Sequence, residues 1–197
     1  MITIRPESIS ERDNYKFLIG SVIPRPIAFI TSINSEGVVN GAPFSYFNIV
    51  SSNPPLLSVS IQRRNGEKKD TLRNIEQQQS FVLHIADDGY IDKLNQTAAQ
   101  LPPNQSEISL TNLTLIPSET IATPAISEAK VRYECTVQQI VDLPNSELII
   151  ANITCYHIDD ELYANGRINA AKLNPISRLA GNDYAHLGET FTLERPQ

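Results

Sequence analysis

The strongest constraint on the fold is a pair of long strand-like segments separated by a short turn. In residues 131–141 the side chains alternate, with Val131, Tyr133 and Cys135 on one face and mostly charged or polar residues on the other. A period of two is typical of a half-exposed β-strand. Residues 143–146 read Leu-Pro-Asn-Ser, which predicts a turn, and residues 147–158 form a second long run. Two long antiparallel strands of this kind favour the wall of a β-barrel.

Shorter strand signals fill the first half of the chain. Apolar and β-branched runs occur at residues 26–33, 38–42, 56–61 and 80–86. The first two flank the turn sequence Asn-Ser-Glu-Gly, in which Gly37 can take a positive φ, so they predict a β-hairpin. Many strands, few helices and no regular βαβ alternation predict a mainly β fold, a β-barrel with attached helices. A length of 197 residues fits one domain, residues 1–197.

Helical signals are fewer. Asp88 is placed to cap a helix that the prolines at 102–103 would end. The apolar positions of this helix follow helical spacing: Ile91, Leu94, Ala98 and Leu101. The chain contains neither Gly-x-Gly-x-x-Gly nor Gly-x-x-x-x-Gly-Lys, so dinucleotide or P-loop binding by those motifs is unsupported.

Charge and composition exclude several classes of protein. The formal net charge is −6, from 16 basic and 22 acidic residues, which disfavours nucleic acid as the main partner. The sequence has no run of about 18 apolar residues, so a membrane span is not expected. The N-terminus lacks a basic region followed by an apolar core, so we expect no signal peptide and a cytoplasmic location.

The two cysteines, Cys135 and Cys155, lie in the long runs that are expected to pair, so they could approach each other across the hairpin. In a reducing compartment we expect both to be free, buried thiols. A metal site made of Cys135, Cys155 and His157 is conceivable. Their spacing lacks the paired ligands of zinc sites, which disfavours that interpretation.

A basic loop precedes another predicted helix. Its cations are Arg63, Arg64, Lys68 and Lys69. Asp70 is a good N-cap for a helix over residues 71–79, with Leu72 and Ile75 on one face. Helix N-termini attract anions, arginine grips phosphate through paired N–H groups, and Thr71 adds a hydroxyl. These features predict a phosphate site, with a capped helix beside a solvated basic loop as the alternative.

A polar and aromatic segment lies ahead of that loop. Hydrogen-bonding side chains that could meet the edge of a flavin ring or its ribityl hydroxyls are Ser45, Asn48, Ser51 and Ser52. Phe44, Tyr46 and Phe47 could bracket the ring, or Phe44 and Tyr46 could be alternating strand residues that face inward and outward. Arg25 lies between two prolines on a stiff extended backbone, as a candidate cofactor ligand or a surface arginine.

No catalytic side chains stand out in the sequence. His84, His157 and His186 lie in separate contexts, and no Ser/His/Asp or Cys/His set can be assembled around them. No pair of carboxylates has a persuasive context for acid–base chemistry. If the protein is an enzyme, we therefore expect a cofactor to carry the reaction.

Short motifs along almost the whole chain resemble the flavin reductase-like family with the FMN-binding split-barrel fold, in particular its flavoredoxin-type members. They are Pro-Arg-Pro-Ile-Ala at 24–28, Asn-Gly-Ala-Pro-Phe-Ser-Tyr-Phe-Asn at 40–48, Asn-Pro-Pro-Leu at 53–56, Lys-Asp-Thr-Leu-Arg-Asn-Ile at 69–75, Phe-Val-Leu-His-Ile at 81–85 and Arg-Leu-Ala-Gly-Asn-Asp-Tyr at 178–184. Leu-Gly-Glu follows at 187–189. Each motif alone is loose, but their common order is specific.

The resemblance implies a homodimer with FMN bound near the subunit interface. The residues it implies for the flavin are Ser45, Tyr46, Phe47 and Asn48, and those for the phosphate are Arg63 or Arg64, with Lys69 and Thr71. Two positions depart from the family pattern, with His84 in place of a small amide residue and Ala180 in place of a glycine. Tyr184 and His84 are candidates to shape the acceptor side of the flavin.

The function implied by the resemblance is that of an FMN-dependent oxidoreductase. NADH or NADPH would reduce the flavin, which would pass its electrons to an acceptor such as a partner protein or a monooxygenase. Two other classes stay open, an electron-transfer flavoprotein fed by a partner protein and a non-enzymatic FMN-binding protein. The sequence offers no short nicotinamide motif that separates them.

Overall fold

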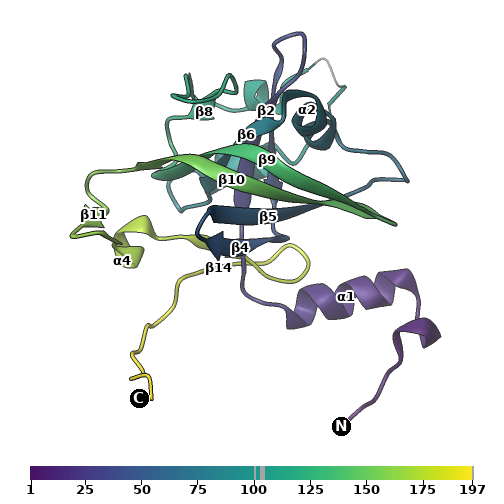
Figure 1. Cartoon of the computed structure of the whole chain (residues 1–197). Coiled ribbons are helices and arrows are strands. Elements are labelled where there is room, and N and C mark those ends of the chain that lie inside the picture. Colours follow the sequence, from purple (N-terminus) through teal and green to yellow (C-terminus); the bar gives the residue numbers. More distant parts are fainter. Residues whose placement is uncertain (100, 103–104, 197) are drawn as a thin grey trace.

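The computed structural model describes residues 1–99, 101–102 and 105–196. The main element of these described residues is an antiparallel seven-stranded sheet, with its strands in the order β3-β2-β6-β9-β10-β5-β4 (Figure 1). The strands are β2 (Ala28–Ile33), β3 (Val39–Phe44), β4 (Phe47–Ser52), β5 (Pro55–Gln62), β6 (Ser80–Ile85), β9 (Val131–Leu143) and β10 (Ser146–Ile158). The mainly β fold predicted from the sequence is confirmed.

The long β9–β10 hairpin lies between the two ends of this sheet (Figure 1). Its pairing runs from Ser146 opposite Leu143 to Ile158 opposite Val131, so the predicted hairpin is confirmed with a tighter turn. A register shift next to Cys155 leaves Cys135 opposite Ile153, so the two thiols are not cross-strand partners. Such bulges raise the local twist and redirect side chains.

The helix α2 (Asp70–Gln78) packs against β2, β3 and β6. Leu72 and Ile75 are fully buried, as their spacing predicted. The expected cap was wrong by one residue: Lys69 takes the extended cap conformation, and Asp70 is the first helical residue. The Asp70 carboxylate instead accepts a hydrogen bond from Arg73, one turn further on, at 2.9 Å.

The second predicted helix is shorter than expected. α3 spans Ile91–Gln96, and its N-cap is Tyr90 rather than Asp88. The helix ends because Thr97 turns back, with its hydroxyl donating to the Leu94 carbonyl at 2.7 Å. Ala98 and Leu101 therefore fall beyond the helix, and of the two prolines expected to end it, Pro103 lies outside the described residues.

Two apolar cores lie on opposite faces of β2. Ala28 and Ile30 join the first core, with side chains from β5, β6, β9, β10 and α2. Phe29 joins the second core, with side chains from α3, from η2 (Glu107–Leu110) and from β8 (Ala125–Ile126). A strand that is buried on both faces reads as a continuous apolar run, which explains why residues 26–33 show no alternation.

The helix α1 (Glu11–Ser21) lies away from the sheet (Figure 1). It is fully described, and Ile19 is its one buried residue, whereas Phe17 and Leu18 are 51% and 58% exposed. After it, a small sheet forms from β1 (Arg25–Pro26), β13 (Ile176–Arg178) and β14 (Tyr184–His186). The remaining elements are η1 (Pro6–Ser8), β7 (Leu115–Ile116), β11 (Tyr163–Ala164), β12 (Arg167–Ile168) and α4 (Ala170–Leu173).

Within the described ranges, no helix has both the length and the apolar character needed to cross a membrane.

Candidate functional site

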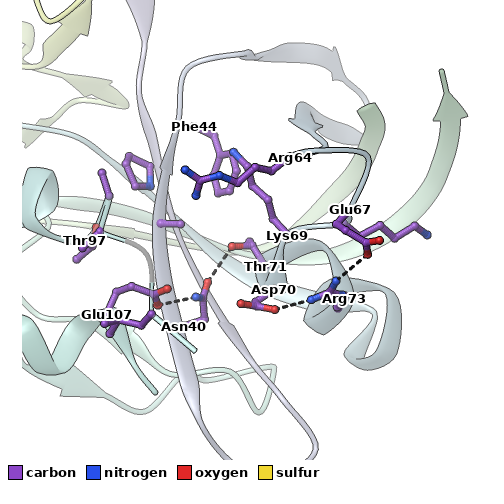
Figure 2. A pocket seen from close by; sticks show the side chains of 16 residues that line it. Asn40, Phe44, Arg64, Glu67, Lys69, Asp70, Thr71, Arg73, Thr97 and Glu107 are labelled. Atoms are coloured by element: carbon purple, nitrogen blue, oxygen red, sulfur yellow. Dashed lines mark hydrogen bonds and ion pairs between the residues drawn. The ribbon is translucent and has the colours of Figure 1, made fainter. Parts of the chain in front are cut away.

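A cleft follows the corner between β3 and β4. Its first part, here called the α2 cavity, has a volume of about 410 Å³ and lies between the end of β3, the start of α2 and the segment after α3 (Figure 2). A second part of about 620 Å³, here called the Tyr184 cavity, extends toward β14. Pro43, Phe44 and Ala98 line both cavities, so the two parts adjoin.

The cleft continues on the other side of the same corner. A third part of about 410 Å³, here called the β4 cavity, is lined by Leu18 of α1 and by Val22, which follows that helix, together with Phe47 and Asn48. A small space of about 150 Å³ adjoins it and has Tyr46 in common with it. The predicted phosphate and ring segments therefore border one connected set of cavities.

Two cations in the α2 cavity lack an acidic partner. Among the described residues, neither Arg64 nor Lys69 makes an ion pair. Burial, and then the charge of Arg64, lower the pKa of Lys69, whose ammonium lies 5.6 Å from the centre of the Phe44 ring. Figure 2 shows Arg64 and Lys69 side by side over the start of α2. This arrangement favours an anion, since a helix N-terminus adds unpaired N–H groups.

Thr71 belongs to a buried hydrogen-bond chain at the base of this cavity (Figure 2). Its hydroxyl donates to Asn40 Oδ1 at 2.8 Å, and Asn40 Nδ2 donates to Glu107 Oε2 at 2.6 Å. Burial raises the pKa of Glu107. Because the hydroxyl hydrogen of Thr71 is already donated to Asn40, its backbone N–H is the better donor for an anion. The sequence reasoning missed Asn40 and Glu107 as site residues.

The other basic side chains of the loop are neutralised by carboxylates. Arg63 lies outside the α2 cavity and donates to the buried Glu147 at 2.9 and 2.6 Å. Lys68 pairs with Glu76 at 2.5 Å, although it lines the cavity. Asp70 also lines the cavity, but its carboxylate is held by Arg73. The structure thus separates Arg63 and Arg64, which the sequence presented as alternatives.

The predicted ring-binding segment, residues 45–48, lies at the corner between β3 and β4 and borders the cleft. Ser45 borders the Tyr184 cavity and the β4 cavity, whereas Tyr46, Phe47 and Asn48 border the β4 cavity. Ser51 lies further along the edge strand β4, outside all the cavities above, where its Oγ accepts a hydrogen bond from the Asn53 N–H at 3.2 Å.

Arg25 is buried, so the surface-arginine alternative is excluded. Its guanidinium donates to three backbone carbonyls, those of Ile19 at 2.8 Å, Val22 at 2.6 Å and Leu179 at 2.7 Å. It therefore ties the end of α1 to the loop after β13. Within the described part of the chain, Arg25 Nε and the Tyr46 hydroxyl are buried without a hydrogen-bond partner, and both residues line the β4 cavity.

The two candidates for the acceptor side lie in different places. Tyr184 lines the cavity named after it, with the Arg178 guanidinium 4.4 Å from its ring centre. His84 lies in the sheet interior and is fully buried, with Nδ1 3.0 Å from the Phe29 carbonyl and Nε2 accepting from the Ile126 N–H at 3.0 Å. Burial lowers its pKa to about 3, so His84 is a neutral structural residue.

Comparisons with known proteins agree on one relationship. The family model "Flavin reductase like domain" matches residues 19–172. The fold superimposes on nitrilotriacetate monooxygenase component B from Bacillus cereus with a TM-score of 0.97, 52% identity and 98% coverage of both chains. For 2-nitrobenzoate 2-nitroreductase NbaA from Pseudomonas fluorescens the TM-score is 0.91, with 30% identity over 99% of this chain and 96% of that one. A split-barrel protein from Shewanella frigidimarina NCIMB 400, 18% identical with full coverage of both chains, shares the fold with a TM-score of 0.85.

Proposed function

Because this chain belongs to the flavin reductase-like family and is a flavin-dependent oxidoreductase with a split-barrel fold, we propose that its flavin is FMN and that NADH or NADPH reduces it. The family and the fold that the sequence motifs resembled are thereby confirmed. The flavin would supply the electron chemistry, while the protein binds it, orients it and sets its electrostatic surroundings.

The observation that carries the FMN proposal is the pair of uncompensated cations at the start of α2. A terminal phosphate in the α2 cavity would balance Arg64 and Lys69, and the N–H of Thr71 would donate to it. Riboflavin, which has no phosphate, would leave both cations unbalanced.

The donors at the β3–β4 corner suit the polar parts of the ring and its side chain. Ser45 and Tyr46 lie where the cavities meet, Asn48 lines the β4 cavity alone, and all three would form hydrogen bonds with the flavin. Burial raises the pKa of Tyr46, so its unpaired hydroxyl would stay a donor. Arg25 lines the same cavity and has an unpaired Nε, and its guanidinium would supply a positive charge near a bound flavin. These orphaned polar atoms fit a ligand with exposed acceptors.

We assign Arg63 to its ion pair with Glu147 rather than to the phosphate, because it lies outside the α2 cavity. The Tyr184 cavity is the larger part of the cleft and would admit the nicotinamide or an acceptor next to the flavin. Arg178 and Tyr184 line this cavity, and their stacked side chains would contact the incoming molecule.

A homodimer is part of the same proposal. Ile49 and Val50, on the edge strand β4, are 74% and 49% exposed. Leu18 of α1 and Val22, just after that helix, line the β4 cavity. Contiguous exposed apolar side chains mark interaction surfaces. A second subunit on this face would close the β4 cavity, and Ser51 would reach a flavin only across such an interface.

The component B match suggests the acceptor. That protein is named as component B of a nitrilotriacetate monooxygenase, and it is 52% identical to this chain. We propose that the reduced flavin serves a partner monooxygenase. The experiment must separate this reductase function from two alternatives. One is an electron-transfer flavoprotein that a partner protein reduces, and the other is a non-enzymatic FMN-binding protein.

The decisive experiment is a visible absorption spectrum of the purified protein with FMN, followed by anaerobic mixing with NADH and NADPH. Rapid bleaching of the flavin bands by either nucleotide supports the proposed reductase. Bound flavin that neither nucleotide reduces, but that a partner protein does, would favour electron transfer. A protein that fails to bind added FMN would refute the proposal.

A further inference from the structure

Three metal-ligating side chains converge outside the proposed flavin site, on the β9–β10 hairpin. Glu134 of β9 lies directly opposite Cys155 of β10, and His157 follows Cys155 by two residues on the same strand. Opposite positions in an antiparallel pair share a face, as do alternate residues along one strand. The carboxylate, the thiol and the imidazole therefore meet, and their ligand atoms all lie within 4.8 Å of one another.

The convergence depends on an irregularity in the sheet. Ile153 of β10 lies opposite Cys135 of β9. After Ile153 the register shifts by one residue, so that Cys155 lies opposite Glu134. Without that shift, Thr154 would oppose Glu134, and Cys155 would lie on the opposite face, with the core residue Cys135. Bulges that redirect a side chain occur frequently beside functional sites.

We propose that Glu134, Cys155 and His157 bind a zinc ion, with a fourth coordination position open to water. A thiolate, an imidazole and a carboxylate are the ligand types that zinc takes, whereas magnesium and calcium take oxygen ligands. A thiolate and a carboxylate with a neutral imidazole carry two negative charges, which balance a divalent ion. Zinc bonds of about 2.0–2.3 Å place tetrahedral ligand atoms roughly 3.3–3.8 Å apart. This spacing lies within the 4.8 Å that bounds the present separations, and His157 Nε2 and Glu134 Oε1 would move apart from 2.8 Å.

In the proposed site, the zinc ion takes the place of the hydrogen between His157 and Glu134. His157 Nε2 and Glu134 Oε1 are 2.8 Å apart and share one hydrogen, so a zinc ion in its place would turn both atoms into ligands. Glu134 would keep its other contacts, since Oε1 accepts from the Glu119 N–H at 2.7 Å and Oε2 accepts from Thr120 at 2.6 Å. Such outer contacts hold a ligating carboxylate in place.

The cluster also has an access route. His157 lines a cavity of about 560 Å³ that runs along the ends of β9 and β10, with Arg132 and Tyr156 in its wall. Of the three ligands only His157 lines this cavity, so a metal ion would approach the cluster from the side of His157. The sequence-based set of Cys135, Cys155 and His157 is thereby corrected, because Cys135 is buried in the first core, where burial raises its pKa.

The test is zinc binding by the full-length protein. The chain is freed of metal with a chelator, titrated with zinc against a chromophoric competitor, and separately loaded with cobalt. We expect one zinc ion per chain and a near-ultraviolet thiolate-to-cobalt charge-transfer band. Cys155→Ser should abolish that band, and Cys155→Ser or His157→Gln should weaken zinc binding by at least about 10- to 100-fold.

Two variants serve as controls. Cys135→Ser and His186→Gln remove the other thiol and another imidazole and should leave the zinc affinity and the cobalt band unchanged. Circular dichroism verifies folding, and His157→Gln keeps the test valid if Cys155→Ser does not fold. Absence of stoichiometric zinc binding would overturn the proposal. Zinc binding by Cys155→Ser and His157→Gln that is as strong as that of the unaltered protein would overturn it too. Because FMN binding is measured separately, this outcome is independent of the proposed flavin function.

Discussion

Replacing Arg64 with glutamine tests the phosphate site most directly. Arg64 and Lys69 are the cations of the α2 cavity without an ion pair in the described chain, so the phosphate of FMN should depend on them. A hydrogen bond to a charged group contributes about 1.5–3 kcal/mol, and about 1.4 kcal/mol corresponds to a tenfold change in affinity. Arg64→Gln should therefore weaken FMN binding roughly 10- to 100-fold.

Riboflavin provides the internal reference, since it has the same ring and ribityl chain without the phosphate. The dissociation constants of both ligands are measured by quenching of flavin fluorescence. Arg64→Gln should change the riboflavin constant by less than about twofold, because no phosphate contact is lost. Thr71→Ala should affect FMN less than Arg64→Gln does, since the Thr71 hydroxyl already donates to Asn40.

The matched control is Arg63→Gln, which removes the neighbouring cation. Arg63 pairs with Glu147, whose side chain is 1% exposed, so this variant should lose stability while the ratio of FMN to riboflavin affinity stays unchanged. Equal losses of FMN and riboflavin affinity in Arg64→Gln would refute the phosphate assignment. A loss of FMN affinity in Arg63→Gln without a loss of riboflavin affinity would instead assign the phosphate contact to Arg63.

Three further predictions concern the pH dependence, the core and the assembly. The pKa of His84 is about 3 in the folded protein against 6.5 ordinarily, so the unfolded chain binds more protons between these values and stability falls as the pH drops below 6.5. Between about pH 6 and about pH 5 this linkage lowers the free energy of unfolding by about 1 kcal/mol. His84→Asn should reduce the pH dependence of the unfolding free energy measured in urea, and an unchanged pH dependence would contradict this prediction. Gly41→Ala should destabilise the fold by about 1–3 kcal/mol in the same assay, since a Cβ there would lie 2.8 Å from Ile108 Cγ1. Gly20→Ala in α1 has open space and should stabilise by up to about 1 kcal/mol, and similar losses in both variants would argue against the clash. Ile49→Lys should raise the dimer dissociation constant by about tenfold or more in sedimentation experiments and change monomer stability by under about 0.5 kcal/mol; an unaffected dimer would exclude the β4 face.

Local patterns predicted the elements whose surroundings are uniform along their length. The β9–β10 hairpin followed from the alternation in residues 131–141 and from the turn sequence after it, although the register of the pair shifts twice along its length. The burial of Leu72 and Ile75 followed from helical spacing in the same way. The length of α3 did not, since the apolar spacing continues past Gln96 while the Thr97 side chain ends the helix.

The candidate site divides along the same line. The basic loop, the start of α2 and the ring segment could be recognised because their residues lie close together in the chain. Asn40 and Glu107 could not be recognised, because they come from elements 67 residues apart and meet only in the folded protein. The position of Cys155 beside Glu134 likewise depends on a bulge that leaves no mark in the sequence.

The sequence by itself determined that this chain forms an antiparallel β fold with an anion-attracting loop ahead of a helix, because strand alternation and helix starts are local properties. Only the tertiary structure decided which of two adjacent arginines faces that site. Arg63 is neutralised by Glu147, which lies 84 residues away, while Arg64 opens into the α2 cavity without a carboxylate partner in the described chain. Charge compensation depends on which side chains meet in space, and for distant residues that is decided by strand pairing.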